Sequence, residues 1–125
     1  MADTTDPAAA AAVLPSDSAE RKRYPLASGL LDYFPAALAE VARVSWVGNE
    51  KHNPGEPLHH ARGKSMDHAD CILRHLLQRG EFDDVKLGDV THRVRHSACL
   101  AWRALALLQQ ELEDAGVPMA RGARE

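Results

Sequence analysis

Glycine and proline divide this chain into three segments with helical spacing, and this division limits its possible folds more than any other feature. Within each segment apolar residues recur every three or four positions, which places them on one face of a helix. Aromatic residues make up only 5% of the chain, so the core must be built mainly from Leu, Val and Ala. The sequence therefore predicts an all-α fold, a small helical bundle. The predicted helices run from Pro35 to Gly48, from Met66 to Arg79 and from Val90 to Asp114.

The ends of the three segments carry ordinary helix-capping residues. Pro35 suits the first turn of the first helix, and Asp32 is close enough to act near its cap. Ser65 is a good N-cap for the second helix and Gly80 a good terminator, while Asp89 can cap the third helix. Between the helices, residues 49–64 are predicted to form a long loop and residues 83–88 a polar linker.

Composition along the chain predicts a single domain with loose ends. Residues 1–23 are rich in Ala, Asp, Thr, Ser and Pro with few large apolar side chains, so we expect a disordered tail. Residues 24–116 are expected to form one helical domain, and residues 117–125 to fray. Roughly ninety ordered residues make a modest core, so we expect the protein to be a homo-oligomer.

Charge and cysteine content argue against several protein classes. A formal net charge of -3 makes a general, charge-driven binder of nucleic acid unexpected. Two cysteines are too few for a disulfide scaffold, which favours a cytoplasmic location. Asp3 and Asp6 precede the alanine run Ala8–Ala12, where a signal peptide would carry positive charge. We therefore expect neither export nor membrane insertion.

The seven histidines all lie between His52 and His96. Where the long loop enters the second helix, imidazole alternates with carboxylate at Asp67, His68 and Asp70. This mixture can bind a divalent metal, because imidazole suits Mn, Fe, Co or Zn and carboxylate oxygens suit Mg and Mn. The same pattern is equally consistent with a solvated loop and helix face, since it meets no strict metal-binding motif.

A second group of polar residues recurs along the third predicted helix. His92, His96, Cys99 and Arg103 are spaced to share one stripe. If the second and third helices pack side by side, His75 and His96 can converge on one pocket, where Arg74 or Arg103 could hold a phosphate. The alternative is a partly buried helix edge whose histidine is satisfied by a hydrogen bond.

Four stretches of the chain resemble a known family when they are taken together. Over about residues 24–113 the sequence is similar to the phage dATP/dGTP diphosphohydrolase N-terminal domain family, a MazG-like group. The stretches that carry the resemblance are LDYFPAAL from Leu31, GNEKHNPGEPLH from Gly48, KSMDHADCILRH from Lys64 and RHSACLAWRAL from Arg95.

The resemblance implies an all-α pyrophosphohydrolase of phage nucleotide metabolism, acting in the host cytoplasm. Its substrate would be a purine deoxynucleoside triphosphate, split into the monophosphate and pyrophosphate with a divalent cation, Mg²⁺ or Mn²⁺. We assign catalytic proton transfer to His59, His75 and His96, substrate binding to His52, Asn53, Lys64, Arg74 and Arg103, and metal ligation to Asp67, His68 and Asp70.

Two other functions remain open from the sequence. The first predicted helix carries only Glu40, whereas MazG enzymes resemble one another in a Glu-Glu-x-x-Glu helix, and this favours a non-enzymatic protein that binds a nucleotide, a metal or a protein partner. A DNA-associated accessory factor that uses Arg93, Arg95 and Arg103 is a lesser alternative because of the negative net charge.

Overall fold

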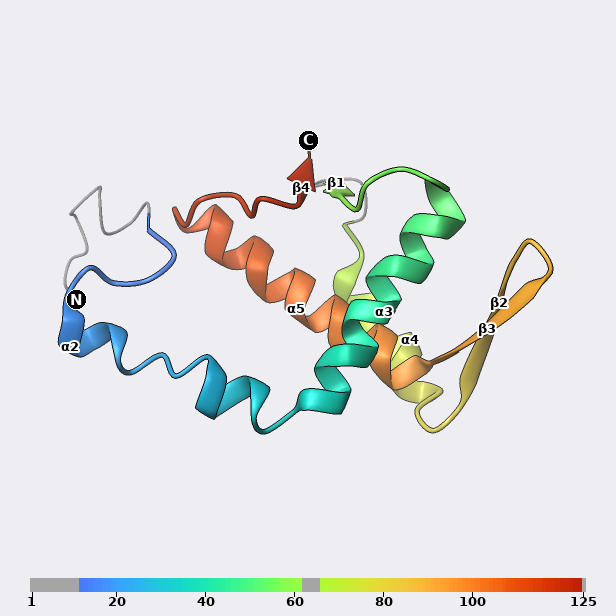
Figure 1. Ribbon diagram of the computed structural model, residues 1–125, viewed down its shortest axis with the longest axis horizontal. Coiled ribbons are helices and arrows are strands. Elements are labelled where there is room, and N and C mark those ends of the chain that lie inside the picture. The colour runs from blue at the N-terminus through green and yellow to red at the C-terminus, as the bar shows by residue number, and fades with distance from the viewer. Residues whose placement is uncertain (1–11, 62–65, 125) are drawn as a thin grey trace.

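The computed structural model describes residues 12–61 and 66–124 as a mostly helical small domain with a two-stranded hairpin (Figure 1). Helices α3, α4 and α5 form the body, and shorter elements precede and follow them. The elements in chain order are α2 (Ser18–Arg21), the short π-helix η1 (Ala27–Leu31), α3 (Pro35–His52), β1 (His60–Ala61), α4 (His68–Leu77), β2 (Phe82–Leu87), β3 (Val90–Arg95), α5 (His96–Asp114) and β4 (Ala123–Arg124).

Helix α5 is the centre of the body, because both α3 and α4 pack on it (Figure 1). The indole Nε1 of Trp102 on α5 donates a hydrogen bond of 2.7 Å to the Ser45 hydroxyl on α3, which fixes the crossing of the two helices. The buried apolar residues of the described part are few and mostly small. They are Val47, Cys71, Val94, Ala98, Ala106 and Ala123.

The hairpin corrects the all-α prediction. Strands β2 and β3 pair antiparallel from Phe82 with Arg95 to Leu87 with Val90. The turn between them uses Gly88, whose φ of 63° is a left-handed conformation that favours glycine. Residues 90–95, predicted as the first turns of the third helix, are therefore a strand, and α5 begins only at His96. The sequence does contain a signal for this hairpin: the dipeptide Gly88-Asp89 separates two short runs that contain Val, which is typical of a two-residue hairpin turn.

The other helix boundaries also differ from the capping residues in the sequence. Helix α3 continues through Gly48 to His52, since a single glycine in a helix costs only about 1 kcal/mol. Helix α4 is shorter than expected, and Asp67 occupies its N-cap position without a side-chain capping bond. Phe34, not Asp32, is the N-cap of α3. Ser65, the expected cap of the second helix, lies outside the described residues.

Both ends of the chain carry short elements where the sequence predicts a tail and a frayed end. In the described part of the N-terminal segment, Ser18–Arg21 form one exposed helical turn, capped by the Asp17 carboxylate on Glu20 N. At the other end, β4 pairs parallel with β1 in the register His60 with Ala123. Glu113 Oε2 accepts a hydrogen bond of 3.0 Å from Ala120 N, which holds the segment leading to β4.

Among the helices that the structure describes, none has both the length and the apolar character required to cross a membrane.

Candidate functional site

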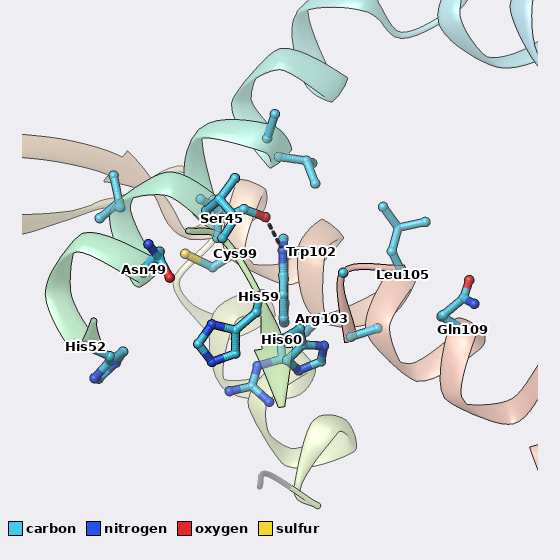
Figure 2. Close-up of a pocket in the computed structure, with 18 of the residues that line it drawn as sticks. Ser45, Asn49, His52, His59, His60, Cys99, Trp102, Arg103, Leu105 and Gln109 are labelled. Atoms are coloured by element: carbon cyan, nitrogen blue, oxygen red, sulfur yellow. Dashed lines mark hydrogen bonds between the residues drawn. The ribbon is translucent and has the colours of Figure 1, made fainter. Parts of the chain in front are cut away.

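A groove of about 1140 Å³ runs along α5, with walls from α3, from the residues before and in β1, and from the C-terminal segment. Figure 2 shows its interior with Trp102 near the middle. In that view His52, Asn49 and His59 lie on one side of Trp102, and Leu105 and Gln109 lie on the other. The groove therefore has a polar end rich in imidazole and a more apolar end along the second half of α5.

The groove brings together five residues that the sequence analysis selected. They come from three separate parts of the chain: the end of α3, the segment before β1, and the α4–α5 pair. These residues are His52, Asn53, His59, His75 and Arg103. Arg74, Asp67, Asp70, His68 and His96 are not part of its lining, and Lys64 lies outside the described residues.

His75 and His96 meet at the α4–α5 interface, but they do not share one pocket as the sequence analysis expected. Their Nδ1 atoms lie 3.0 Å apart and their ring centroids 5.2 Å apart. A hydrogen bond between two imidazole nitrogens requires one to donate and the other to accept, so at least one ring is neutral. His75 also lines the groove, whereas His96 is buried and does not line it. His92, expected on the same stripe, instead lies on β3 with its ring 5.2 Å from that of Trp46.

The surroundings of His75 favour its neutral form. Burial lowers the pKa of His75 below its ordinary value, and the neighbouring His96, Arg103 and Arg74 lower it further, while Asp83 acts in the opposite direction. A neutral imidazole has a free lone pair on one ring nitrogen, so His75 can accept a proton near neutral pH.

The lowered pKa of His75 predicts a loss of stability in mild acid. The unfolded chain binds a proton at His75 near pH 6.5, whereas the folded chain binds it only at lower pH. The free energy of unfolding should therefore fall as the pH drops through 6.5, and this contribution should be fully present above that pH. Urea unfolding at a series of pH values, for the wild type and for His75→Gln, measures it. Parallel curves for the two proteins would contradict the prediction.

The expected metal ligands do not form a cation site with one another. Asp67 Oδ2 lies 3.4 Å from an Arg74 guanidinium nitrogen, and His68 Nδ1 lies 3.1 Å from Arg103 Nη1. Within residues 12–61 and 66–124, no three His, Cys, Asp or Glu side chains gather closely enough to hold a metal ion. The donor set predicted around Asp70 therefore does not fit a divalent cation in this arrangement.

His68 does not ligate a metal in this arrangement but contacts Arg103, which lines the groove. Arg103 can only donate, so His68 Nδ1 accepts the hydrogen bond and the imidazole is in a form that leaves Nδ1 unprotonated. The two residues are 35 positions apart, and their bond joins the first turn of α4 to the middle of α5. It fixes the position of a guanidinium that also lines the groove, which is the geometry needed to hold an anionic group there.

Asn49 is a groove residue that the sequence analysis missed. It is 6% exposed, and its Nδ2 donates a hydrogen bond of 2.8 Å to the carbonyl oxygen of Glu56. This bond holds residues 53–56 against the end of α3. Among the residues that the structure describes, Asn49 Oδ1 has no hydrogen-bond partner. The sequence suggested a loop after Gly48, and so gave no reason to expect a buried asparagine on a helix.

His60 and Cys99 are further lining residues that sequence reasoning did not assign to a site. The His60 ring packs edge-on against Trp102, with centroids 4.9 Å apart. Cys99 lies on α5 between His96 and Arg103, and burial raises the pKa of its thiol. The sequence analysis placed Cys99 on the polar stripe of the third predicted helix without giving it a role, and the groove that both residues line forms only when β1 and α5 come together.

Cys99 provides a chemical probe of the groove. Its raised pKa keeps the thiol protonated near neutral pH, so we expect slow alkylation by iodoacetamide. An anionic ligand in the polar end of the groove should slow the reaction further. Mass spectrometry of the Cys99 peptide measures the rate, and the peptide with Cys71, which does not line the groove, is the internal control. Equal Cys99 rates with and without inorganic triphosphate would count against anion binding there.

Comparison with known proteins identifies the chain's relatives at the family level. A family model described as dATP/dGTP diphosphohydrolase, N-terminal, matches residues 15–119, which include every element from α2 to α5. No curated protein and no solved structure matches the chain.

Proposed function

This chain belongs to the dATP/dGTP diphosphohydrolase N-terminal family, and on this premise we propose that it binds a purine deoxynucleoside triphosphate in the groove and hydrolyses it. The products would be the deoxynucleoside monophosphate and pyrophosphate. The observation that carries the proposal is the convergence of Arg103, His52, His59 and His75 on one groove.

The polar end of the groove is suited to a triphosphate. Arg103 provides a planar guanidinium that can donate two parallel hydrogen bonds to a phosphate. His52 and His59 add ring nitrogens to the lining, and Asn53 adds an amide. Lys64 follows the same segment in the sequence, and we propose that it contacts the phosphates as well. The aromatic Trp102 provides an apolar surface for the deoxyribose or base.

His75 is the residue best placed for proton transfer. In the proposed reaction, water attacks the α-phosphorus, a new P–O bond forms, and the bond to the bridging oxygen of the pyrophosphate group breaks. His75 Nε2 takes the proton from the attacking water while its Nδ1 keeps the hydrogen bond with His96. His96 then holds the ring in one tautomer, as a carboxylate does in other general-base pairs.

A divalent cation stays a prediction for this protein. When bound to a triphosphate, Mg²⁺ or Mn²⁺ neutralises phosphate charge. The described side chains offer no set of three ligands for it, so we assign no step of the reaction to the cation.

Calorimetric titration with each of the four deoxynucleoside triphosphates tests the binding part of the proposal. We expect dATP and dGTP to bind, dCTP and dTTP to bind more weakly, and Arg103→Met to weaken dATP binding at least about tenfold. Arg95→Met is the matched control, because Arg95 stacks on Phe82 of the hairpin and does not line the groove. Undetectable binding of every nucleotide would refute the proposal.

Two observations favour a second function, nucleotide binding without hydrolysis. Nowhere in residues 12–61 and 66–124 do three metal-ligating side chains cluster, and Glu40 of α3 is paired with Arg43 at 3.2 Å. Under this alternative the titrations give the same affinities but no pyrophosphate is released. A DNA-binding role has less support, since Arg93 and Arg95 both stack on Phe82 while Arg103 lines the groove.

A further inference from the structure

Asn49 carries a buried side-chain oxygen that has no hydrogen-bond partner among the residues that the structure describes. The residue is only 6% exposed, and it lines the groove near the C-terminal end of α3. Almost every buried polar atom in a folded protein has a partner, and leaving one unsatisfied costs about as much as losing a hydrogen bond. The unpaired oxygen therefore indicates a donor that arrives with a bound molecule.

The amide of Asn49 cannot turn over to remove this unpaired acceptor. Its Nδ2 donates a hydrogen bond of 2.8 Å to the carbonyl oxygen of Glu56, and a carbonyl can only accept. Turning the amide over would place two acceptor oxygens against each other. The bond with Glu56 therefore fixes Oδ1 as an acceptor whose position is set before a ligand binds.

Asn49 lies one helical turn from the point where Trp102 contacts α3. The indole Nε1 donates to the hydroxyl of Ser45, and positions 45 and 49 share one face of α3, about 6 Å apart along its axis. Trp102 and Asn49 both line the groove, and Figure 2 shows them together in it. A planar ring system that stacks on the indole can therefore present its edge to Asn49 Oδ1.

The unpaired oxygen distinguishes between the parts of a deoxynucleoside triphosphate. Oδ1 can only accept, so it offers nothing to the phosphate oxygens, which are acceptors as well. The donors of dATP and dGTP are the amino groups of the bases, the ring N–H of guanine and the 3′-hydroxyl of the sugar. A hydroxyl also needs a donor for its own lone pairs, whereas the amino group of a purine only donates. The base amine is thus the best match for a lone buried acceptor.

We propose that Asn49 is a specificity-determining residue whose Oδ1 accepts a hydrogen bond from the exocyclic amino group of a purine base stacked on Trp102. This inference rests on the proposed function, because it takes a purine nucleotide as the ligand of the groove. Side chains that now shield the oxygen would change rotamer on binding, as they commonly do at binding surfaces. A purine without an amino group would leave the oxygen unpaired and would bind more weakly.

Calorimetric titration of the full chain with three triphosphates tests the inference without any variant. The ligands are dATP, which has a 6-amino group, 2-aminopurine 2′-deoxyriboside triphosphate, which has a 2-amino group, and purine 2′-deoxyriboside triphosphate, which has neither. We expect at least one of the two amino ligands to bind about tenfold more tightly than the unsubstituted purine, or better. As a control, 2′,3′-dideoxy-ATP lacks the 3′-hydroxyl and should bind as dATP does.

Two variants separate recognition of the amine from a merely structural role of Asn49. Asn49→Ala and Asn49→Asp both lose the Nδ2 donor and its bond with Glu56, but only Asn49→Asp keeps an acceptor oxygen. The preference for the amino ligand, taken as a ratio of dissociation constants, should disappear in Asn49→Ala and persist in Asn49→Asp. Loss of the bond with Glu56 alone would change the two variants alike.

The possible outcomes distinguish this inference from the proposed function. Equal affinities of the wild type for amino and unsubstituted purines would overturn the inference and leave the proposed function in place. A preference that Asn49→Ala retains, or one that both variants lose, would overturn it as well, and so would a preference that follows the 3′-hydroxyl instead. Absence of binding for every triphosphate would refute the proposed function and this inference with it.

Discussion

Replacing His75 with alanine is expected to lower kcat for pyrophosphate release from dATP by about 100-fold or more, with a smaller effect on KM. The reason is that His75 lines the groove and is held mainly neutral, so it can take the proton of the attacking water. Arg103 and the other groove residues would still bind the phosphates. Steady-state kinetics with a coupled pyrophosphate assay measures both constants.

Two further histidine variants provide the controls for this prediction. His96→Ala removes the hydrogen-bond partner of His75 but no group that lines the groove, so we expect an intermediate loss of kcat. His92→Ala changes a histidine on β3 that packs on Trp46, and kcat should be unchanged. A His75→Ala variant that is folded and retains wild-type kcat would rule out this residue as the general base.

Replacing Trp102 with alanine is expected to destabilise the fold by about 3 kcal/mol. The indole joins α5 to α3 through its hydrogen bond with Ser45, and it packs against the His60 ring of β1. The core is otherwise built from small residues such as Ala98 and Ala106, which leave little other apolar contact to compensate. Urea denaturation followed by circular dichroism measures the change in the free energy of unfolding.

Trp46 is the matched control for Trp102. It lies on α3, is 44% exposed and packs edge-on against His92, so we expect Trp46→Ala to cost about 1 kcal/mol or less. Equal losses for the two variants would show that the groove side of α5 does not form the centre of the fold.

The sequence predicted the elements whose pattern is local. Apolar spacing located the three long helices, and the prediction that His75 and His96 converge follows from packing two amphipathic helices side by side. The hairpin was missed because residues 90–95 also fit a helical stripe, in which His92 and His96 are four residues apart. Pairing with Phe82–Leu87 decided the conformation, and that contact is not visible in a window of helical length.

The groove could be predicted only in part, because its residues meet through long-range contacts. The bond between Arg103 and His68 spans 35 positions, and the bond between Trp102 and Ser45 spans 57. Spacing alone placed His68 with Asp67 and Asp70 as a metal site. In the structure its Nδ1 instead accepts a hydrogen bond from a guanidinium on α5, a partner that no local motif identifies.

The product spectrum of the reaction tests the central claim most directly. Incubation of the purified protein with dATP and Mg²⁺ or Mn²⁺, followed by ³¹P nuclear magnetic resonance, separates the possible outcomes. The proposed hydrolysis predicts that the triphosphate signals give way to those of dAMP and pyrophosphate, at a rate that His75→Ala reduces. Release of orthophosphate and dADP would contradict it. A triphosphate that binds to the protein but is not hydrolysed would contradict it as well.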